Sequence, residues 1–308
     1  MDRTPREVEY SPSSCVESID AELERYRLAS DAAAARHPPR ELRHGPTPPE
    51  RLLVVEAALG APLHVFVHGG YWQALGAADS WMPATESVAS GTSFAAVDYT
   101  LAPAAPIGTI VEQCVRAVEV VVAELRPSVV TLSGSSAGAH LAALVAQRAL
   151  VRIDRLLLLS GVFRLAPLVR TYVNDALGLD DASAAAWSVP LSPRPDAQVV
   201  VLHGEHETAS FKAQSARLAA AWGVPTVEVC GRNHFDLVFD LAAIDRRLGR
   251  PQPAGEPVDP DDPAVEVAVA ERPGAPRRLM PAALRPDEPD GRPGSGVPDE
   301  PVAGGPHG

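Results

Sequence analysis

Apolar residues are arranged along most of the chain in two alternating patterns. Short runs rich in branched aliphatic residues, typical of buried strands, occupy residues 63–67, 93–98, 129–133, 155–160, 198–203 and 226–229. Longer stretches with apolar residues at helical spacing lie between them, at residues 79–90, 107–125, 137–150, 210–222 and 235–248. Strands that alternate with helices are joined by right-handed crossovers. The pattern therefore predicts an α/β fold with a mostly parallel, doubly wound sheet and flanking helices.

The residues before this alternation have a different pattern. Residues 1–40 form a polar N-terminal extension with a helical patch over 16–35, which we expect to pack on the edge of the main domain. Strand-like runs at 41–44 and 51–56 flank a proline-rich turn. These two runs predict an antiparallel start to the sheet.

The main domain is expected to cover residues 41–249, with one interruption and one tail. The alternation breaks over about 163–195, where helical patterns at 167–177 and 180–187 are too long for a simple connection. We expect them to form a small helical cap over the site. Residues 250–308 are rich in proline, glycine and acidic residues, so they cannot bury enough apolar surface to offset their ordering entropy. This tail is expected to be disordered.

Charge and cysteine content narrow the classes of partner and compartment. The 308-residue chain has a formal net charge of −12, which argues against a nucleic-acid or anionic-membrane surface. No apolar run approaches the roughly 20 residues that span a bilayer, and the charged N-terminus is not followed by the apolar core of a secretory signal. Three widely spaced cysteines fit a reducing compartment. We expect a cytoplasmic protein that binds neither nucleic acid nor membrane, and a homodimer is left open.

The segment with the most specific chemistry is Gly134-x-Ser136-x-Gly138, which lies between a predicted strand and a predicted helix. That order is the context of a nucleophile elbow, in which a sharp turn holds a serine hydroxyl above the sheet. Small residues are needed at the flanks because the turn leaves no room for side chains. The alternative is an ordinary Gly/Ser turn. We interpret Ser136 as a nucleophile.

A serine hydroxyl becomes a good nucleophile only when a base takes its proton and an acid orients that base. His234 follows the last predicted strand and opens the last helix, so it is the expected base. The acid should follow the run 198–203, where Glu205 and Glu207 both stand. Glu205 lies on the turn itself and is expected to brace it. We favour Glu207, because one further short loop lets it turn back towards His234.

The run 63–67 leads into a loop with two adjacent glycines, whose backbone amides can turn inward. We expect an oxyanion hole formed by the amides of Gly70, Tyr71 and Ala137. His68 is expected to hold this loop by hydrogen bonds rather than to act as a base. Tyr71 and Trp72 are candidates for substrate contacts, although they could equally be packing residues.

Metal and phosphate sites are less well supported. His203 and His206 have the spacing of a ligand pair, but on a strand end they need not face the same way. The Gly134–Gly138 turn is not followed by the Gly-Lys-Ser/Thr of a phosphate loop. We expect no metal and no cofactor.

Four motifs together resemble the kynurenine formamidase (arylformamidase) branch of the α/β-hydrolases, which is close to the hormone-sensitive-lipase-like esterases. They are His68-Gly69-Gly70-Tyr71-Trp72-Gln73, Gly134-Ser135-Ser136-Ala137-Gly138-Ala139-His140-Leu141, Phe211-Lys212-x-Gln214-Ser215 and Asn233-His234-Phe235. The resemblance covers about residues 20–248 and omits the tail.

The resemblance implies an α/β-hydrolase fold with a Ser136, Glu207 and His234 triad acting on an aryl formamide such as N-formylkynurenine. The sequence departs from that family at Glu207, where Asp is common, and at Arg164, where an acidic residue is expected. Two alternatives stay open: a carboxylesterase for small acyl esters, and a non-catalytic ligand-binding protein of the same fold. Each implies a small-molecule ligand.

Overall fold

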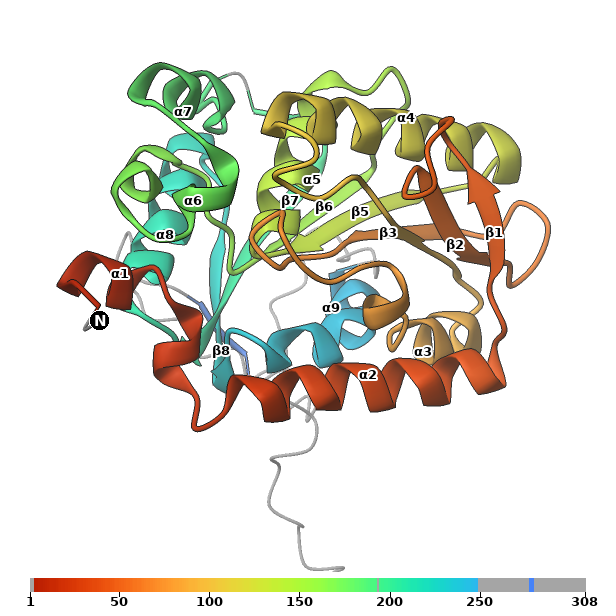
Figure 1. Cartoon of the computed structure of the whole chain (residues 1–308). Coiled ribbons are helices and arrows are strands. Elements are labelled where there is room, and N and C mark those ends of the chain that lie inside the picture. The colour runs from red at the N-terminus through yellow and green to blue at the C-terminus, as the bar shows by residue number, and fades with distance from the viewer. Residues whose placement is uncertain (1–2, 193, 249–276, 280–308) are drawn as a thin grey trace, which may run out of the picture.

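A nine-stranded sheet forms the centre of the part of the chain that the computed structural model describes, residues 3–192, 194–248 and 277–279 (Figure 1). The strands are β1 (Arg40–Arg43), β2 (Arg51–Val55), β3 (Leu63–Val67), β4 (Ser93–Val97), β5 (Val130–Ser135), β6 (Arg155–Leu159), β7 (Gln198–His206), β8 (Thr226–Asn233) and β9 (Arg277–Leu279). Their order is β1-β2-β4-β3-β5-β6-β7-β8-β9. Strand β2 pairs antiparallel with β1 and β4, and all pairs from β4 to β9 are parallel. The predicted mostly parallel sheet and its antiparallel start are confirmed.

Helices cover both faces of this sheet. They are α1 (Pro5–Glu9), α2 (Ile19–Arg36), α3 (Ala84–Ala89), α4 (Ile107–Leu125), α5 (Ala137–Arg148), α6 (Asn174–Leu177), α7 (Asp181–Trp187), α8 (Ala209–Trp222) and α9 (Leu241–Leu248). Short 3-10 turns are η1 (Pro12–Cys15), η2 (Ala78–Ser80), η3 (Ala166–Arg170) and η4 (Asp236–Asp240). Figure 1 shows α4 and α5 on one side of the sheet and α2, α3 and α9 on the other.

The alternation of side chains along the strands divides the core into two layers. On β3, Val65 and Val67 pack with α4 and α5, whereas Phe66 packs on the opposite face with α2, α3 and α9. Helix α4 buries Ile110, Val111 and seven further residues along one face. Each large aliphatic side chain removed from water in this way contributes roughly 1.5–3 kcal/mol. This packing fixes the strand ends that carry the site.

Several expected boundaries differ from the structure for local reasons. The stretch 79–90 is not one helix but η2 followed by α3, because Pro83 lacks the amide hydrogen that a continuous helix needs. The stretch 235–248 is likewise divided into η4 and α9. Strands β7 and β8 extend beyond the apolar runs that predict them, and their pairing continues to His206 and Asn233 across an irregularity.

The stretch expected to form a cap folds into η3, α6 and α7, which lie above α8 in the view of Figure 1. Gln214 of α8 joins this stretch to the main domain, because its side-chain amide bonds both the backbone N–H and the carbonyl of Arg164. Within the tail expected to be disordered, residues 277–279 form β9 beside β8. The rest of that expectation lies outside the described residues. Among the described residues, no helix is both long and apolar enough to cross a membrane.

Candidate active site

Ser136 stands at the sharp turn between β5 and α5. Its backbone has φ 56° and ψ −118°, in the left-handed region that costs free energy for a residue with a side chain. A Cβ at Gly134 would lie 2.2 Å from the carbonyl oxygen of Gly138, and a Cβ at Gly138 would lie 2.0 Å from that of Val67. Only glycine therefore allows the strand and helix to approach so closely. The expected strand, turn and helix context of Ser136 is present.

Glu207 and His234 form a buried pair beyond the ends of β7 and β8. Oε2 of Glu207 lies 3.1 Å from Nδ1 of His234, and their side chains are 1% and 5% exposed. The other carboxylate oxygen accepts hydrogen bonds from the Gly204 amide and the Ser160 hydroxyl, each at 2.5 Å. The ring of Phe211 packs edge-on against His234, with 4.6 Å between ring centroids. The imidazole is thus held on two sides.

The environment of Glu207 keeps its carboxyl group ionised. Burial by itself raises the pKa of this carboxyl, but hydrogen bonds from His234, Ser160 and the Gly204 amide outweigh burial and hold the pKa below its ordinary value. An ionised carboxylate accepts a hydrogen bond from Nδ1–H of His234. The second ring nitrogen, Nε2, is then the basic one.

Glu205 has a different neighbourhood. One of its carboxylate oxygens accepts a hydrogen bond of 2.9 Å from the Gly231 amide in β8, and its backbone carbonyl accepts one from Nζ of Lys212. Glu205 therefore braces β7, β8 and α8. The structure places Glu207, not Glu205, against the histidine.

Three backbone amides at or near the elbow have no acceptor among the described residues. Gly70, Tyr71 and Trp72 follow one another with φ of 87°, 51° and 60°, which turns the loop after β3 tightly. The amides of Gly70, Tyr71 and Ala137 donate no hydrogen bond to any residue that the structure describes. The loop also touches the elbow directly, because a Cβ at Gly69 would lie 3.2 Å from Cβ of Ser136. The expected oxyanion donors are therefore close to the serine and unoccupied by protein acceptors.

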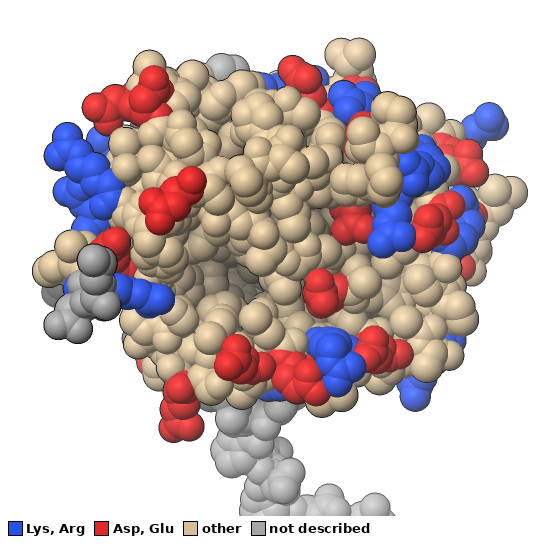
Figure 2. Space-filling model, in the orientation of Figure 1, with Lys and Arg blue, Asp and Glu red and all other residues tan. Residues whose placement is uncertain are grey.

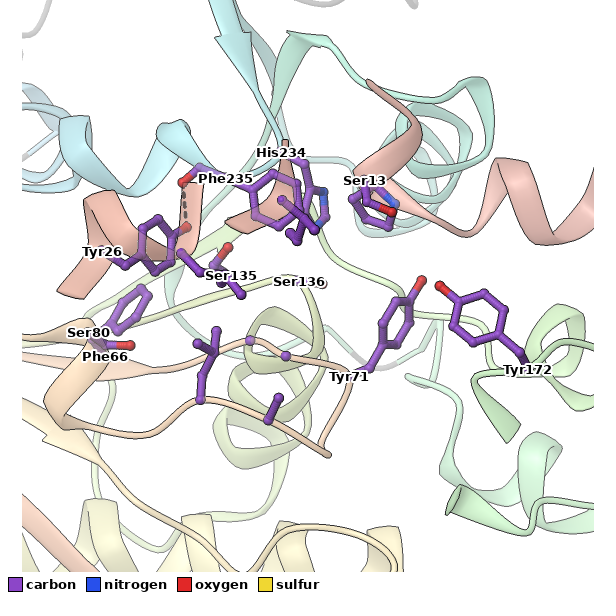
Figure 3. Close-up of a pocket in the computed structure, with 17 residues that line it drawn as sticks. Ser13, Tyr26, Phe66, Tyr71, Ser80, Ser135, Ser136, Tyr172, His234 and Phe235 are labelled. Atoms are coloured by element: carbon purple, nitrogen blue, oxygen red, sulfur yellow. Dashed lines mark hydrogen bonds between the residues drawn. The ribbon is translucent and has the colours of Figure 1, made fainter. Parts of the chain in front are cut away.

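Ser136 and His234 line the same cavity, which has a volume of about 270 Å³ (Figure 3). Its apolar walls come from Ile19, Leu23, Tyr26, Phe66, Leu75 and Phe235. Hydroxyl groups of Ser13, Ser80, Ser135 and Tyr172 supply polar atoms. Figure 2 shows the corresponding hollow in the face of the molecule between α1, α6 and α2, with uncharged residues around its mouth.

The N-terminal extension contributes more than expected, because it builds one wall of this cavity instead of packing only on the domain edge. The Tyr71 hydroxyl donates to the carbonyl of Tyr10 at 2.6 Å, and the hydroxyls of Ser11 and Tyr172 lie 3.0 Å apart. Tyr26 donates to the carbonyl of Phe235, the residue after the histidine. The helical spacing of Ile19, Leu23 and Tyr26 was the available signal for a buried face.

Two sequence-based candidates lie elsewhere. Trp72 does not line the cavity; its side chain is fully buried in the core, where it packs edge-on against His140 at 5.1 Å. The expected substrate contact at Trp72 is therefore wrong, because the left-handed turn directs this side chain inwards while Tyr71 lines the cavity. Arg164 is exposed and borders a separate hollow between α7 and α8.

His68 holds the loop after β3 (residues 68–72, here called the oxyanion loop) by hydrogen bonds, as expected. It does not border the cavity. Its Nδ1 bonds the carbonyl of Gly69 at 2.9 Å, and its ring stacks on Tyr99 with 4.2 Å between centroids. Ser160 was missed in the sequence, although a small polar residue directly after a strand was a usable signal.

The ligand-like spacing of His203 and His206 does not produce a shared site. His203 is buried and bonds the carbonyl of Gly204, whereas His206 is exposed at the end of β7. Within the described part of the chain, no three His, Cys, Asp or Glu side chains are grouped so as to hold a metal ion.

Comparison with known proteins places this geometry in a family. A family model for the alpha/beta hydrolase fold matches residues 64–227, so the chain belongs to the α/β-hydrolase family. It is 30% identical to kynurenine formamidase of Salmo salar over 210 residues, which cover 62% of this chain and 71% of that one. It is 28% identical to kynurenine formamidase of Danio rerio over 269 residues, covering 78% and 92%.

Solved structures agree with this placement. A candidate thioesterase from Silicibacter sp. TM1040 is 28% identical with a TM-score of 0.72, over 78% of this chain and 95% of that one. The fold is shared with EstE1, a thermophilic carboxylesterase from a metagenomic library, at 21% identity, a TM-score of 0.60 and coverage of 78% and 98%. The chain is a hydrolase related to kynurenine formamidases, and it shares its fold with carboxylesterases.

Proposed function

We propose that Ser136, His234 and Glu207 are a catalytic triad that hydrolyses an aryl formamide such as N-formylkynurenine. The observation that carries the proposal is the pairing of His234 with a buried carboxylate at the rim of the cavity that contains Ser136. The kynurenine formamidases among the relatives of this chain support the choice of substrate class.

In the first half of the reaction, Oγ of Ser136 attacks the formyl carbon and its proton passes to Nε2 of His234. Negative charge develops on the carbonyl oxygen, where the amides of Gly70, Tyr71 and Ala137 can donate. Each such donor contributes roughly 3–4 kcal/mol. The C–N bond then breaks, His234 returns the proton to the departing arylamine, and a formyl ester of Ser136 remains.

In the second half, water replaces the arylamine. His234 takes a proton from the water as its oxygen attacks the formyl ester, and the resulting tetrahedral intermediate collapses. The proton returns to Oγ of Ser136 and formic acid leaves, which then releases its proton to solvent to become formate. Glu207 stays ionised throughout and orients the imidazole.

A carboxylesterase acting on small acyl esters is the second candidate. The apolar wall of Ile19, Leu23 and Phe66 is compatible with it, because such a wall accepts simple aryl or alkyl alcohols as readily as arylamines. The chemistry would be the same, with an alcohol in place of the amine.

The test compares N-formylkynurenine with p-nitrophenyl acetate, using wild type and Ser136→Ala. The variant should lose on the order of 10⁴-fold or more in kcat on whichever substrate is cleaved. Deformylation that depends on Ser136 would support the formamidase. Ester cleavage alone would favour the esterase, and near-normal turnover by Ser136→Ala would refute the triad.

A further inference from the structure

Tyr10, which follows α1 in the N-terminal extension, lies between the oxyanion loop and the residues that support His234. It is 8% exposed. Its backbone carbonyl accepts the Tyr71 hydroxyl at 2.6 Å, and its ring packs on that of Phe211 with 6.1 Å between centroids. We propose that Tyr10 is a positioning residue, which keeps the Tyr71 amide and the His234 ring aligned with each other. The proposal rests on the proposed triad but not on the choice of substrate.

The first of these contacts restrains a strained part of the oxyanion loop. Tyr71 has φ 51°, and Gly70 and Trp72 on either side of it are also left-handed. A residue with a side chain keeps this conformation only where the surrounding structure holds it. The bond to Tyr10 anchors the far end of the Tyr71 side chain. It therefore also restrains the backbone amide of Tyr71, which we assign to the oxyanion hole.

The second contact reaches the proposed base through one intervening ring. Phe211 is 1% exposed, and it packs on Tyr10 from one side and edge-on against His234 from the other. The bond to Glu207 fixes Nδ1 of the imidazole, and Phe211 limits the tilt of the imidazole plane. Without the ring of Tyr10, Phe211 would lose part of its packing and could move away from the histidine.

The backbone beside Tyr10 is tied to the segment that follows the proposed acid. The carbonyl of Glu9 accepts the Thr208 hydroxyl at 2.7 Å, and the Glu9 carboxylate accepts the Ser210 amide at 2.9 Å. Thr208 directly follows Glu207 and is the residue from which α8 starts. The extension therefore joins the segment after Glu207 to the oxyanion loop, and Tyr10 is the residue at which the two connections meet.

Positioning can be separated from a role in the cavity wall. Tyr10 is not one of the described residues that line the cavity, so its influence must pass through Tyr71 and Phe211. A wall residue mainly changes how tightly a compound binds. A residue that aligns the reacting groups changes the rate of the bond-forming step, because small displacements there are costly.

The experiment follows inactivation by an alkyl fluorophosphonate, which requires no knowledge of the natural substrate. Oγ of Ser136 forms a bond to phosphorus, the P–F bond breaks and fluoride leaves, and the hydroxyl proton passes to His234. The phosphoryl oxygen takes the place of the oxyanion. Rates measured over a range of reagent concentrations separate the limiting rate constant, kinact, from the half-saturating concentration, KI.

Four variants are compared with the wild type. Tyr71→Phe removes the hydroxyl that bonds Tyr10, and Tyr10→Leu removes the ring that packs on Phe211. Tyr10→Phe keeps both the ring and the backbone carbonyl, so it is the conservative rescue. Ser14→Ala is the control within the extension, because the Ser14 hydroxyl bonds the carbonyl of Val8 in the same segment. Urea unfolding of each variant shows which of them are folded.

We expect kinact to fall about 10-fold or more in Tyr71→Phe and in Tyr10→Leu, with KI within about 2-fold of wild type. Tyr10→Phe and Ser14→Ala should keep the wild-type kinact. Unchanged kinact in the first two variants, or a change in KI alone, would overturn the proposal. A loss in Tyr10→Phe equal to that in Tyr10→Leu would overturn the contact through the ring.

Tyr71→Phe decides the matter by itself if Tyr10→Leu does not fold, because it deletes one oxygen atom and keeps the packing. A wild-type protein that forms no adduct on Ser136 would reject the triad and this proposal together. Normal labelling of Ser136 with no effect of Tyr71→Phe would reject the proposal alone.

Discussion

The hydroxyl of Ser133 lies 2.6 Å from Nε2 of His64, whose Nδ1 lies 3.1 Å from a carboxylate oxygen of Asp245. This is a second serine, histidine and carboxylate arrangement, three residues before Ser136 in the sequence. Asp245 also accepts from Thr131 and Arg155. Ser133 is completely buried within the sheet and His64 is 1% exposed, so no substrate reaches them. A serine, a histidine and a carboxylate in hydrogen-bonding distance are therefore not enough to identify a catalytic site. The arrangement around Ser136 differs from the one around Ser133 because Ser136 and His234 line a cavity.

The buried arrangement should contribute to stability and not to turnover. Ser133→Ala leaves a ring nitrogen of His64 without its partner, which costs about 1–3 kcal/mol of unfolding free energy. Urea denaturation should show this loss while kcat/KM stays near the wild-type value. A large fall in kcat at unchanged stability would contradict the structural role.

Stability should fall in acid because Asp245 and Glu207 are both buried and hydrogen-bonded as carboxylates. Burial raises the pKa of Asp245, but His64, Arg155 and Thr131 outweigh it, and both carboxyls have pKa values below their ordinary 3.8 and 4.5. A carboxyl whose pKa is lower in the folded state than in the unfolded chain stabilises the fold. This stabilisation is complete above the unfolded-state pKa and is lost as the pH falls through the folded-state pKa. Urea titrations from about pH 6 down to about pH 3 should show this decline. Asp245→Asn should flatten it, and an unchanged slope would contradict the assignment.

The main domain could be predicted from the sequence because each of its elements has a strong local pattern. The runs at 63–67 and 107–125 coincide with β3 and α4. Burial of one or both faces of an element determines the spacing of its apolar residues, so the pattern can be recognised in the sequence. Gly134 and Gly138 mark the elbow because only glycine fits there. The order of Ser136, Glu207 and His234 along the chain follows from the same topology.

Long-range contacts account for what the sequence did not reveal. The N-terminal extension becomes a cavity wall through bonds such as Tyr71 to Tyr10, which join residues 61 positions apart. The inward direction of Trp72 depends on three consecutive left-handed residues, and their φ angles have no pattern in the letters themselves. Helix 79–90 was over-extended because its apolar spacing outweighed the break at Pro83.

Removing charge from the proposed acid should affect catalysis far more than the same change two residues earlier. Glu207→Gln loses the carboxylate that orients His234, and kcat should fall on the order of 10³–10⁴-fold. Glu205→Gln keeps an acceptor for the Gly231 amide and should leave kcat close to wild type. Steady-state kinetics on the same ester compares the two, and the reverse ranking would move the acid to Glu205.

The catalytic role of the oxyanion loop can be tested by substituting two glycines that have similar backbone φ angles, one in the loop and one outside it. Gly70 has φ +87°, and a Cβ there would lie 2.2 Å from the carbonyl oxygen of Ala74. Gly91 has φ +78° with nothing within 4 Å of its Cβ position. Gly70→Ala should displace the loop and lower kcat by about 10²–10³-fold. Gly91→Ala should cost stability through the same backbone strain but keep turnover, and equal losses in both variants would contradict the role of the loop.

The most direct measurement of the central claim is the position of a covalent adduct after treatment with a fluorophosphonate. Intact-mass analysis followed by peptide mapping should find one adduct, on Ser136, in the wild type and in Ser133→Ala. Ser136→Ala should remain unlabelled, and Glu207→Gln should label more slowly. An adduct on another residue, or unchanged labelling of Ser136→Ala, would contradict the assignment of Ser136 as the nucleophile.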